Sequence, residues 1–284
     1  WGLPPDRSIG SYRPLPDLVW RFLWWLGARD KSPFLHHWVN VLLHGANGAL
    51  VTMITYRATN NRRTSWLAGA IFVATAVLTE AVSGVVGIAD VMGALGVLLC
   101  VCALAKPLLK MAPLVFVFTL FGLTSKESAL AIVPMIFVVA FFTAHITHPD
   151  APKRWRRATI AFISSVLAFV VYVEGRKRLF PAPLQPEILP DAVAGKSPLA
   201  RAFAAILRWY AQPALPRDPL NNPLINADTA HRIAGALRVY VRGLYQLINP
   251  WTLSGDYSSP QEPIPTSLVF PESVLGAILM VTPL

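Results

Sequence analysis

The sequence predicts an all-α polytopic membrane protein, and three observations support that fold class. Of its 284 residues, 54% are hydrophobic and only 14% are charged, whereas a soluble domain has about 25% charged residues. The apolar residues gather in long runs, which are typical of membrane-spanning helices. The basic residues, which give a net charge of +10, are concentrated in alternate connecting segments, as the positive-inside rule requires.

Residues 1–33 are predicted to form an outer loop with one interfacial helix. An apolar face at helical spacing, with charged residues around it, is made by Leu18, Val19, Phe22, Leu23, Trp25 and Leu26. A helix of this composition lies in the plane of the membrane–water interface. A soluble surface helix is the alternative interpretation, and the neighbouring tryptophans favour the interface.

Residues 34–173 are predicted to contain six transmembrane helices. Apolar runs alternate there with short segments that hold nearly all the charged residues, so each run can cross the hydrocarbon while the charges stay in water. The predicted spans are residues 34–56, 65–78, 91–105, 112–123, 129–144 and 158–173.

The positions of lysine and arginine predict the orientation of these helices. The segments 57–63, 106–110 and 153–157 are basic, and all three fall on one side if the helices alternate. That side is predicted to be cytoplasmic. The N-terminal segment, residues 79–90, the turn at Lys126 and the chain beyond the sixth helix then lie on the opposite side.

The remainder of the chain is predicted to be a long outer loop followed by further membrane helices. The loop covers residues 174–230 and includes an amphipathic helix with Ile206 and Tyr210 on its apolar face. Further helices are expected in residues 231–284. We expect one membrane domain that is truncated at both ends.

Two carboxylates beside apolar segments are the first candidates for a functional site. Glu80 and Asp90 are the only charged residues between Thr79 and Asp90. A carboxylate near hydrocarbon usually faces a polar cavity and has a function. We therefore expect this turn to form the floor of a water-filled site outside the cytoplasm. A short interfacial loop, whose acidic residues simply meet water, is the alternative.

The first predicted span carries a polar stripe. His37, Asn40, His44 and Asn47 are spaced three, four and three residues apart, so they share one face of a helix. His37, Asn40 and His44 are candidates to line the cavity. Packing against another helix is the alternative, which we favour for Asn47. Two histidines without a third ligand do not define a zinc site, so metal binding is left open.

Several short motifs follow one another in a recognisable order. They are Ser11-Tyr12-Arg13-Pro14-Leu15, Pro33-Phe34, His37-x-x-Asn40-x-x-x-His44, Thr79-Glu80-Ala81-Val82, Gly87-x-Ala89-Asp90, Ser125-Lys126-Glu127, Asn222-Pro223 and Leu253-Ser254-x-Asp256-Tyr257-Ser258. Their order resembles the membrane half of the transmembrane-and-tetratricopeptide-repeat O-mannosyltransferases and their bacterial relatives, in the GT-C glycosyltransferase superfamily. The resemblance implies a GT-C-like helical bundle with interfacial helices in its outer loops, and tetratricopeptide repeats beyond Leu284.

The resemblance also implies a reaction and its partners. The donor would be a polyprenyl-phosphate-linked sugar, and the acceptor a protein on the non-cytoplasmic side. Membrane lipids and other subunits of a membrane complex are further expected partners. We expect no nucleic acid, because the sequence has no ordered array of basic and aromatic residues. The likeness to bacterial forms implies the bacterial inner membrane, with the site facing the periplasm.

Such an enzyme needs a carboxylate that accepts the acceptor's proton and cations that stabilise the departing phosphate. The resemblance places the principal base upstream of Trp1. Glu80 and Asp90 would orient the sugar or the acceptor, or bind a metal. A local ion pair between Lys126 and Glu127 is the alternative to a catalytic role for that motif. The candidates are Glu80, Asp90, Lys126 and Glu127 for catalysis, Lys126, Arg238, Arg242 and Arg13 for the donor phosphate, and His37, Asn40, His44 and Asp256 for the cavity lining.

Four positions depart from the pattern of the family. The family commonly has His-Pro-x-His before Thr-Glu-Ala-Val, where this chain has Thr75, Ala76 and Leu78, and it often has arginine where this chain has Ile88. These losses favour an alternative function. In that hypothesis the chain is a catalytically degenerate GT-C-like subunit that acts as a scaffold or anchor in a larger complex.

Overall fold

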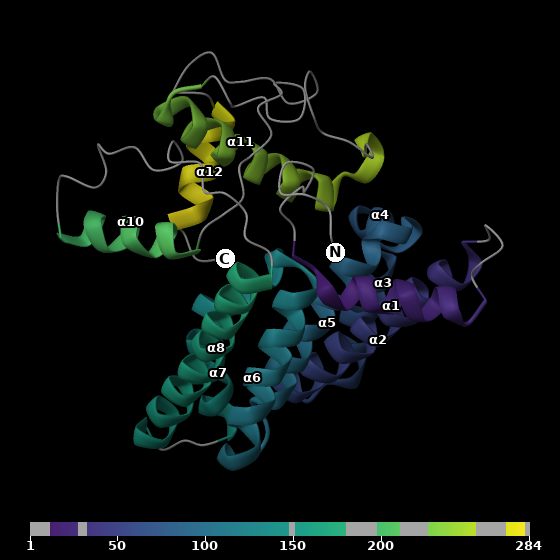
Figure 1. The fold of residues 1–284 in the computed structure, drawn as a ribbon, viewed down its shortest axis with the longest axis horizontal. Coiled ribbons are helices and arrows are strands. Elements are labelled where there is room, and N and C mark those ends of the chain that lie inside the picture. The colour runs from purple at the N-terminus through teal and green to yellow at the C-terminus, as the bar shows by residue number, and fades with distance from the viewer. Residues whose placement is uncertain are drawn as a thin grey trace. The chain divides into compact units, whose positions relative to one another are not determined.

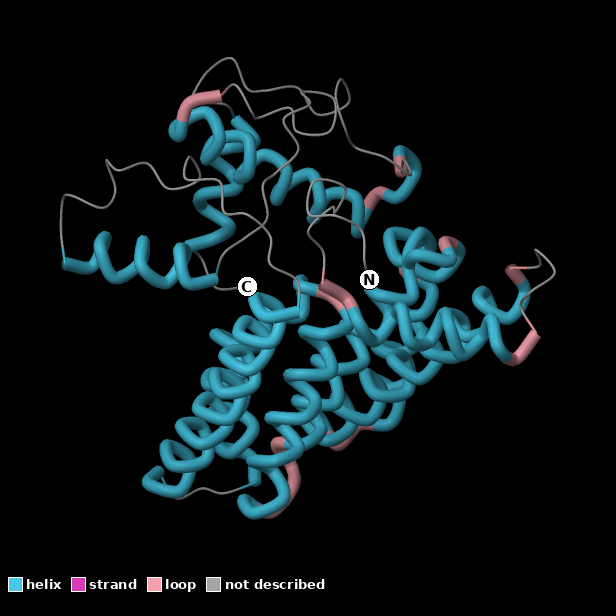
Figure 2. The backbone as a smooth tube through the Cα atoms, viewed as in Figure 1, coloured by secondary structure: helices cyan, strands magenta, loops and turns pink. Residues whose placement is uncertain are grey.

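The computed structural model describes residues 12–27, 33–147, 151–179, 198–210, 227–253 and 271–281 (Figure 1). Every regular element in these ranges is a helix (Figure 2), which confirms the all-α class. The chain divides into two compact units, one of residues 1–74 and 78–213 and one of residues 75–77 and 214–284. Each unit is described by itself below. The predicted motifs around Asn222 and Asp256 lie outside the described residues.

The first unit contains most of the helices. They are α1 (Pro14–Trp25), α2 (Phe34–Thr59), α3 (Arg62–Ala74), α4 (Thr79–Ser83), α5 (Ile88–Ala103), α6 (Leu108–Ser125), α7 (Ile132–Thr147), α8 (Ala151–Leu179) and α10 (Pro198–Tyr210), with the 3-10 helices η3 (Val85–Gly87) and η4 (Glu127–Ala131). A further 3-10 helix, η2 (Ala76–Leu78), stands between α3 and α4 in the sequence.

Several of these helices have the length and the apolar composition that a membrane-spanning helix needs. Among the described residues, Val85–Ala103, Leu108–Ser125 and Lys153–Leu179 are long and apolar enough to cross a membrane. A fourth span results if Arg62–Ala74 and Ala76–Ser83, which are bent by 48°, count together. These segments make the chain an integral membrane protein. The helix α2 is not among them, because its polar stripe interrupts the apolar surface.

The helices α5 and α6 pack so closely that their backbones touch. A Cβ atom on Gly96 would lie 2.7 Å from the Cα and N atoms of Gly122 and 2.9 Å from the carbonyl oxygen of Phe118. Small residues at helix interfaces allow this approach inside membranes. The surrounding core joins α5, α6, α7 and α8 through buried side chains that include Cys100, Met111, Val115, Ile136 and Ala161.

The basic loops meet at one end of α5 and α6. Arg157 donates hydrogen bonds to the carbonyl oxygens of Leu104 and Lys106, at 2.6 and 2.7 Å. Arg57 donates to the carbonyl oxygen of Cys102, at 3.5 Å. The three segments that the charge pattern grouped together are thus neighbours. The start of α5 and the end of α6, which carry the candidate site, lie at the opposite end of these two helices.

The polar stripe of α2 bonds to backbone carbonyls of the segment that runs from α3 to α5. Asn40 Nδ2 donates to the carbonyl oxygens of Gly84, at 2.8 Å, and Val82, at 3.4 Å. Asn47 Nδ2 donates to the carbonyl oxygen of Val91, at 2.9 Å. This segment is broken into short helices and lacks the regular hydrogen bonds of one long helix, and in a membrane such a segment depends on donors from the protein. The stripe therefore supports the turn that leads to Asp90.

Replacing Asn47 with alanine is expected to destabilise the fold by about 1–2 kcal/mol, because a fully buried hydrogen bond between helices is lost. The measurement is thermal unfolding of the purified protein in detergent. Thr59→Ala is the matched control, since Thr59 makes an exposed bond to the carbonyl oxygen of Thr55 within α2. Equal melting temperatures for wild type and N47A would contradict this role.

The second unit contains α11 (Thr229–Ile248), the 3-10 helix η6 (Pro250–Thr252) and α12 (Pro271–Val281). A Cβ atom on Gly276 would lie 2.4 Å from the carbonyl oxygen of Leu237, so α12 touches the backbone of α11. Ser273 Oγ donates to the carbonyl oxygen of Ala234, at 2.7 Å. These contacts hold the two helices together.

The N-terminus of α11 is capped by Asp228. Its carboxylate accepts a hydrogen bond from the backbone N–H of His231 at 2.8 Å, and this bond holds the pKa of Asp228 below its ordinary value. Because the folded pKa is depressed, the cap stabilises the helix above the ordinary aspartate range and fails as the pH falls through the folded pKa. The first turn of α11 should therefore lose protection in acid, which means that the ratio of the intrinsic to the observed exchange rate of its amide protons should fall. Hydrogen-exchange mass spectrometry checks this, and an unchanged acid response in D228A would contradict it.

Candidate functional site

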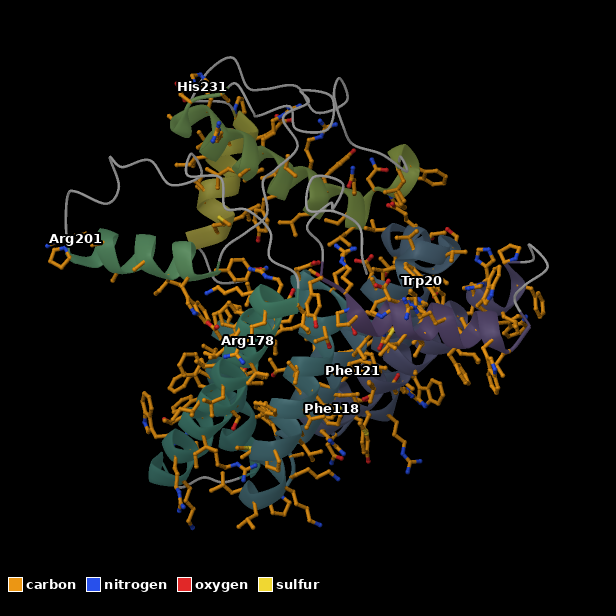
Figure 3. All side chains as sticks on the ribbon, viewed as in Figure 1. Trp20, Phe118, Phe121, Arg178, Arg201 and His231 are labelled. Carbon is orange, nitrogen blue, oxygen red and sulfur yellow. The ribbon has the colours of Figure 1, made fainter. Side chains whose placement is uncertain are left out.

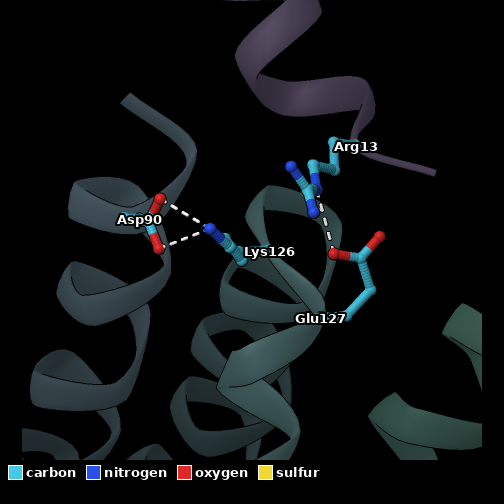
Figure 4. Close-up of polar contacts among 4 residues, drawn as sticks. All are labelled: Arg13, Asp90, Lys126 and Glu127. Carbon is cyan, nitrogen blue, oxygen red and sulfur yellow. Dashed lines mark hydrogen bonds and ion pairs between the residues drawn. The ribbon is translucent and has the colours of Figure 1, made fainter. Parts of the chain in front are cut away.

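Two ion pairs lie side by side where α5 begins and α6 ends (Figure 4). Lys126 Nζ lies 2.6 Å from both carboxylate oxygens of Asp90. Arg13 Nε lies 2.9 Å from Oε2 of Glu127. Lys126 and Glu127 are consecutive in the sequence, but their side chains point in different directions (Figure 4). Each bonds to a distant partner, so the local ion pair considered for this motif is not the one that forms.

The position of Lys126 results from a break in the helix. α6 ends at Ser125, and Lys126 has an extended backbone, with φ −153° and ψ 139°, before η4 begins. A Cβ atom on Gly93 would lie 3.2 Å from Cβ of Lys126. The lysine stem therefore crosses α5 where that helix has no side chain. Since Gly93 is three residues after Asp90, the stem leads Nζ directly to the carboxylate.

The other ion pair connects α1 to the same place. Arg13 precedes Pro14, the first residue of α1, and Glu127 is the first residue of η4. The ring of Tyr12 packs against that of Tyr172 on α8, with centroids 6.1 Å apart. Burial raises the pKa of Tyr12 above its ordinary value, so its hydroxyl stays protonated and can donate a hydrogen bond. The site thus combines residues from four separate parts of the chain.

The ion pairs are accessible to solvent and electrically neutral. The side chains of Lys126 and Glu127 are each 26% exposed, and that of Asp90 is 41% exposed. Ion pairs with this exposure contribute at most about 1 kcal/mol to stability. Lys126 can therefore leave Asp90 for a stronger anion at small cost. A phosphate, with more charge and more acceptor oxygens than a carboxylate, is such an anion.

Glu80 lies apart from these pairs. It is on α4, its side chain is exposed, and no other described residue forms a hydrogen bond or ion pair with its carboxylate. The turn that follows α4 is held by Asn40, whose Nδ2 donates to the carbonyl oxygens of Val82 and Gly84. Asp90 comes after that turn, so the two carboxylates of the predicted cavity floor have different surroundings.

The two histidines of the α2 stripe also differ from one another. His44 is buried, its Nε2 lies 3.3 Å from the carbonyl oxygen of Val73, and its ring stacks on Phe72 with centroids 5.3 Å apart. His37 lines an open, apolar groove with Phe34, Trp38 and neighbouring residues. Within the described ranges, no three His, Cys, Asp or Glu side chains come together in a way that could hold a metal ion.

The remaining candidates belong to the second unit or lie outside the described residues. Arg238 Nε on α11 donates to Oε2 of Glu272 on α12, at 3.0 Å. Arg242 is one turn further along α11. Asp256 is not among the described residues. The donor-phosphate role of the two arginines and the lining role of Asp256 remain predictions.

The structure adds a cluster that the sequence patterns did not indicate, at the end of α8 near Arg178 (Figure 3). The Arg176 guanidinium lies 4.7 Å from the ring centroid of Tyr210 and donates to the Tyr210 carbonyl oxygen. Trp209 Nε1 donates to Oε1 of Glu174, at 2.9 Å. Trp209 and Tyr210 end α10, so these bonds fasten α10 to α8. The run of basic residues after Glu174 is the feature of the sequence that could have indicated this cluster. The partners of the cluster come from α10, 30 or more residues further along the chain, and the sequence does not indicate them.

Taken together, the fold and the ion pairs define a helical membrane protein with a polar site at the ends of its spans. No protein-family model matches the chain, and no solved structure matches it. Part of the sequence is similar to curated proteins. It is 41% identical over 93 residues to the Protein O-mannosyl-transferase tmtc2 of Xenopus laevis, and the matched residues are 32% of this chain and 11% of that protein.

Two further relatives have the same kind of name. The chain is 39% identical over 101 residues to Protein O-mannosyl-transferase TMTC2 of Mus musculus, covering 35% of this chain and 12% of that protein. It is 39% identical over 106 residues to Protein O-mannosyl-transferase Tmtc2 of Drosophila melanogaster, covering 37% of this chain and 11% of that protein. The matched part is thus about a tenth of the length of these relatives. The resemblance to the TMTC-type O-mannosyltransferases is confirmed over about a third of this chain.

Proposed function

We propose that the chain is part of an integral membrane glycosyltransferase that moves a sugar from a polyprenyl-phosphate-linked donor to a protein acceptor. One observation carries this proposal. Three motifs of the resemblance, which contain Arg13, Asp90 and Lys126-Glu127, lie far apart in the sequence but meet in one ion-pair cluster. The cluster lies at the ends of two apolar helices of membrane-spanning length. Relatives named protein O-mannosyl-transferases support mannose as the first sugar to test.

The chemistry assigns different tasks to these residues. The acceptor hydroxyl attacks C1 of the sugar, its proton passes to a carboxylate, and the C1–O bond to the lipid phosphate breaks. Lys126 would leave Asp90 and bind the phosphate as its negative charge grows. Arg13 would act in the same way beside Glu127. Asp90, released from Lys126, would then accept a hydrogen bond from a sugar or acceptor hydroxyl, while Glu80 would orient the acceptor.

The location of the site is part of the proposal. The three basic loops meet at the end of α5 and α6 opposite the ion pairs, which supports a non-cytoplasmic site under the positive-inside rule. We propose the bacterial inner membrane, with the site facing the periplasm, on the motif likeness to bacterial forms. Membrane lipids and other subunits of a complex are the further proposed partners.

A catalytically degenerate subunit that acts as a scaffold or anchor is the second candidate. A specific observation favours it, because Lys126, Arg13 and Arg238 each bond to a carboxylate of the chain itself. The four departures from the family pattern around the Glu80 turn point the same way. In such a subunit these ion pairs would be permanent and would only join helices.

The test is a transfer assay with the whole protein in membranes or nanodiscs. The donor is mannosyl-phosphopolyprenol with a radiolabelled sugar, and the acceptor is a mixture of proteins from the same compartment. Label that enters protein only when both the donor and the purified membrane protein are present supports the enzyme. If no label enters protein with mannosyl, glucosyl or N-acetylglucosaminyl donors, the scaffold is the better account.

A further inference from the structure

Arg176 is a buried cation at the end of α8 that the proposed reaction does not use. It is only 5% exposed, whereas Arg178, two residues later, is exposed. Its guanidinium lies 4.7 Å from the ring centroid of Tyr210 and 5.8 Å from that of Tyr172, and it donates a hydrogen bond to the Tyr210 carbonyl oxygen. A buried charge is costly unless such contacts compensate it. Arg176 would lose these contacts by moving to a phosphate, so a structural task suits it better than ligand binding.

The two tyrosine rings belong to a buried cluster that joins α6, α8 and α10. Its four buried members, each at most 7% exposed, are Leu123, Tyr172, Val173 and Tyr210. Tyr12 packs against this cluster, with its ring centroid 6.1 Å from that of Tyr172. The end of α10 is thus connected through Tyr172 to the residue that stands immediately before Arg13 in the chain.

The same cluster also contacts the segment that carries the other ion-pairing residues of α6 and η4. Leu123 and Leu130 stand three residues before and three residues after Lys126-Glu127 in the sequence. Leu123 is a buried member of the cluster, and Leu130 packs against it. The segments that supply Arg13, Lys126 and Glu127 therefore all rest on one group of packed side chains.

The ion pair alone does not fix the position of Arg13. The side chains of Arg13 and Glu127 are 29% and 26% exposed, and ion pairs with this exposure contribute little to stability. The carbonyl oxygen of Arg13 accepts the first hydrogen bond of α1, from the N–H of Asp17, and this bond is long at 3.5 Å. The packing of Tyr12 against the cluster must therefore supply most of the order at this point.

We infer that Arg176 is a positioning residue for the ion-pair cluster. It fastens the end of α10 against the aromatic rings, Tyr172 supports Tyr12, and Tyr12 sets the place of Arg13 beside Glu127. The effect on the reaction rests on the proposed function, because a cation that is misplaced by about 1 Å meets the developing phosphate charge poorly. The support that Arg176 gives to the start of α1 does not rest on it.

The test compares substitutions in the full chain in nanodiscs. Arg176→Met removes the cation, and Arg176→Lys keeps the charge without the planar guanidinium that contacts both rings. Arg178→Met is the matched control, because Arg178 is an exposed arginine at the same end of α8 (Figure 3). Sugar transfer from mannosyl-phosphopolyprenol gives kcat and KM. Hydrogen-exchange mass spectrometry gives the protection of the peptides that contain Asp17 and Tyr210.

Both substitutions of Arg176 should lower kcat by about 10-fold or more and leave the KM for the donor within about twofold of the wild type. Both should also reduce the protection of the two peptides, and R178M should match the wild type. Wild-type kcat in either Arg176 variant would overturn the inference, because the guanidinium would then not be needed. A raised KM with unchanged kcat would also overturn it, since Arg176 would then bind the donor directly.

Failure of the proposed function can be distinguished from failure of this inference. If the wild type transfers no sugar, the proposed function fails, and the exchange measurement still reports on Arg176. Reduced protection at Asp17 in R176M would then support the positioning role, and wild-type protection there would overturn it. Tyr210→Leu removes the ring from the α10 side and should have the same effects, so it provides the test if R176M does not fold.

Discussion

Replacing Lys126 with methionine is expected to reduce sugar transfer by about 100-fold or more, because one preorganised cation that meets the developing phosphate charge contributes on that scale. Methionine keeps the length of the side chain and its packing over Gly93. The ion pair that is lost is partly exposed, so the fold should survive. The measurement is the initial rate of label transfer from mannosyl-phosphopolyprenol to protein.

The control for this variant is Lys110→Met, an exposed lysine near the opposite end of α6. It should retain the wild-type rate, because the basic loops lie away from the ion pairs. Full activity of K126M would contradict the proposed phosphate role.

Replacing Gly96 with valine is expected to lower the stability of the first unit by about 3 kcal/mol, through overpacking of the α5–α6 contact. The added Cβ atom would lie 2.7 Å from backbone atoms of Gly122. A backbone atom cannot rotate away as the end of a side chain can, so the helices must separate. The measurement is thermal unfolding in detergent, in which the fraction of protein that still elutes as a monodisperse peak on gel filtration is recorded after heating.

Gly45→Ala is the matched control for this prediction. Gly45 is also within a helix, but a Cβ atom there meets nothing within 4 Å. The Gly45→Ala substitution should change the free energy of unfolding by no more than about 1 kcal/mol relative to the wild type. A Gly96→Val protein as stable as G45A would show that α5 and α6 are not in backbone contact.

The helices were predictable because apolar runs between charged segments leave few other solutions in a membrane. Their breaks were harder to foresee. The run from 65 to 78 is interrupted after Ala74, and the chain continues through η2, α4 and η3 before α5 begins. Only the carbonyl partners of Asn40 and Asn47 show why the polar stripe of α2 is needed there. That pairing depends on tertiary contacts 42 to 44 residues apart.

The site was predictable as a set of residues but not as a set of partners. The position of Lys126 next to Glu127 in the sequence indicates a local ion pair, yet the helix break at Lys126 turns the two side chains in different directions. Asp90 and Arg13 supply the actual partners, and nothing in their spacing indicates this. The contact at Gly93 was equally hard to predict from the sequence. The stem of Lys126 passes over α5 at Gly93, where that helix lacks a side chain, and so reaches Asp90.

The most direct test of the central claim is to ask where a lipid phosphate binds. A polyprenyl phosphate that carries a diazirine beside its phosphate is photolysed with the whole protein in nanodiscs, and the labelled peptides are identified by mass spectrometry. The account predicts labelling in residues 88–93 and 123–128 that is lost in the K126M variant and retained in K110M. Labelling elsewhere in the chain, or labelling of these peptides that survives the loss of Lys126, would contradict it.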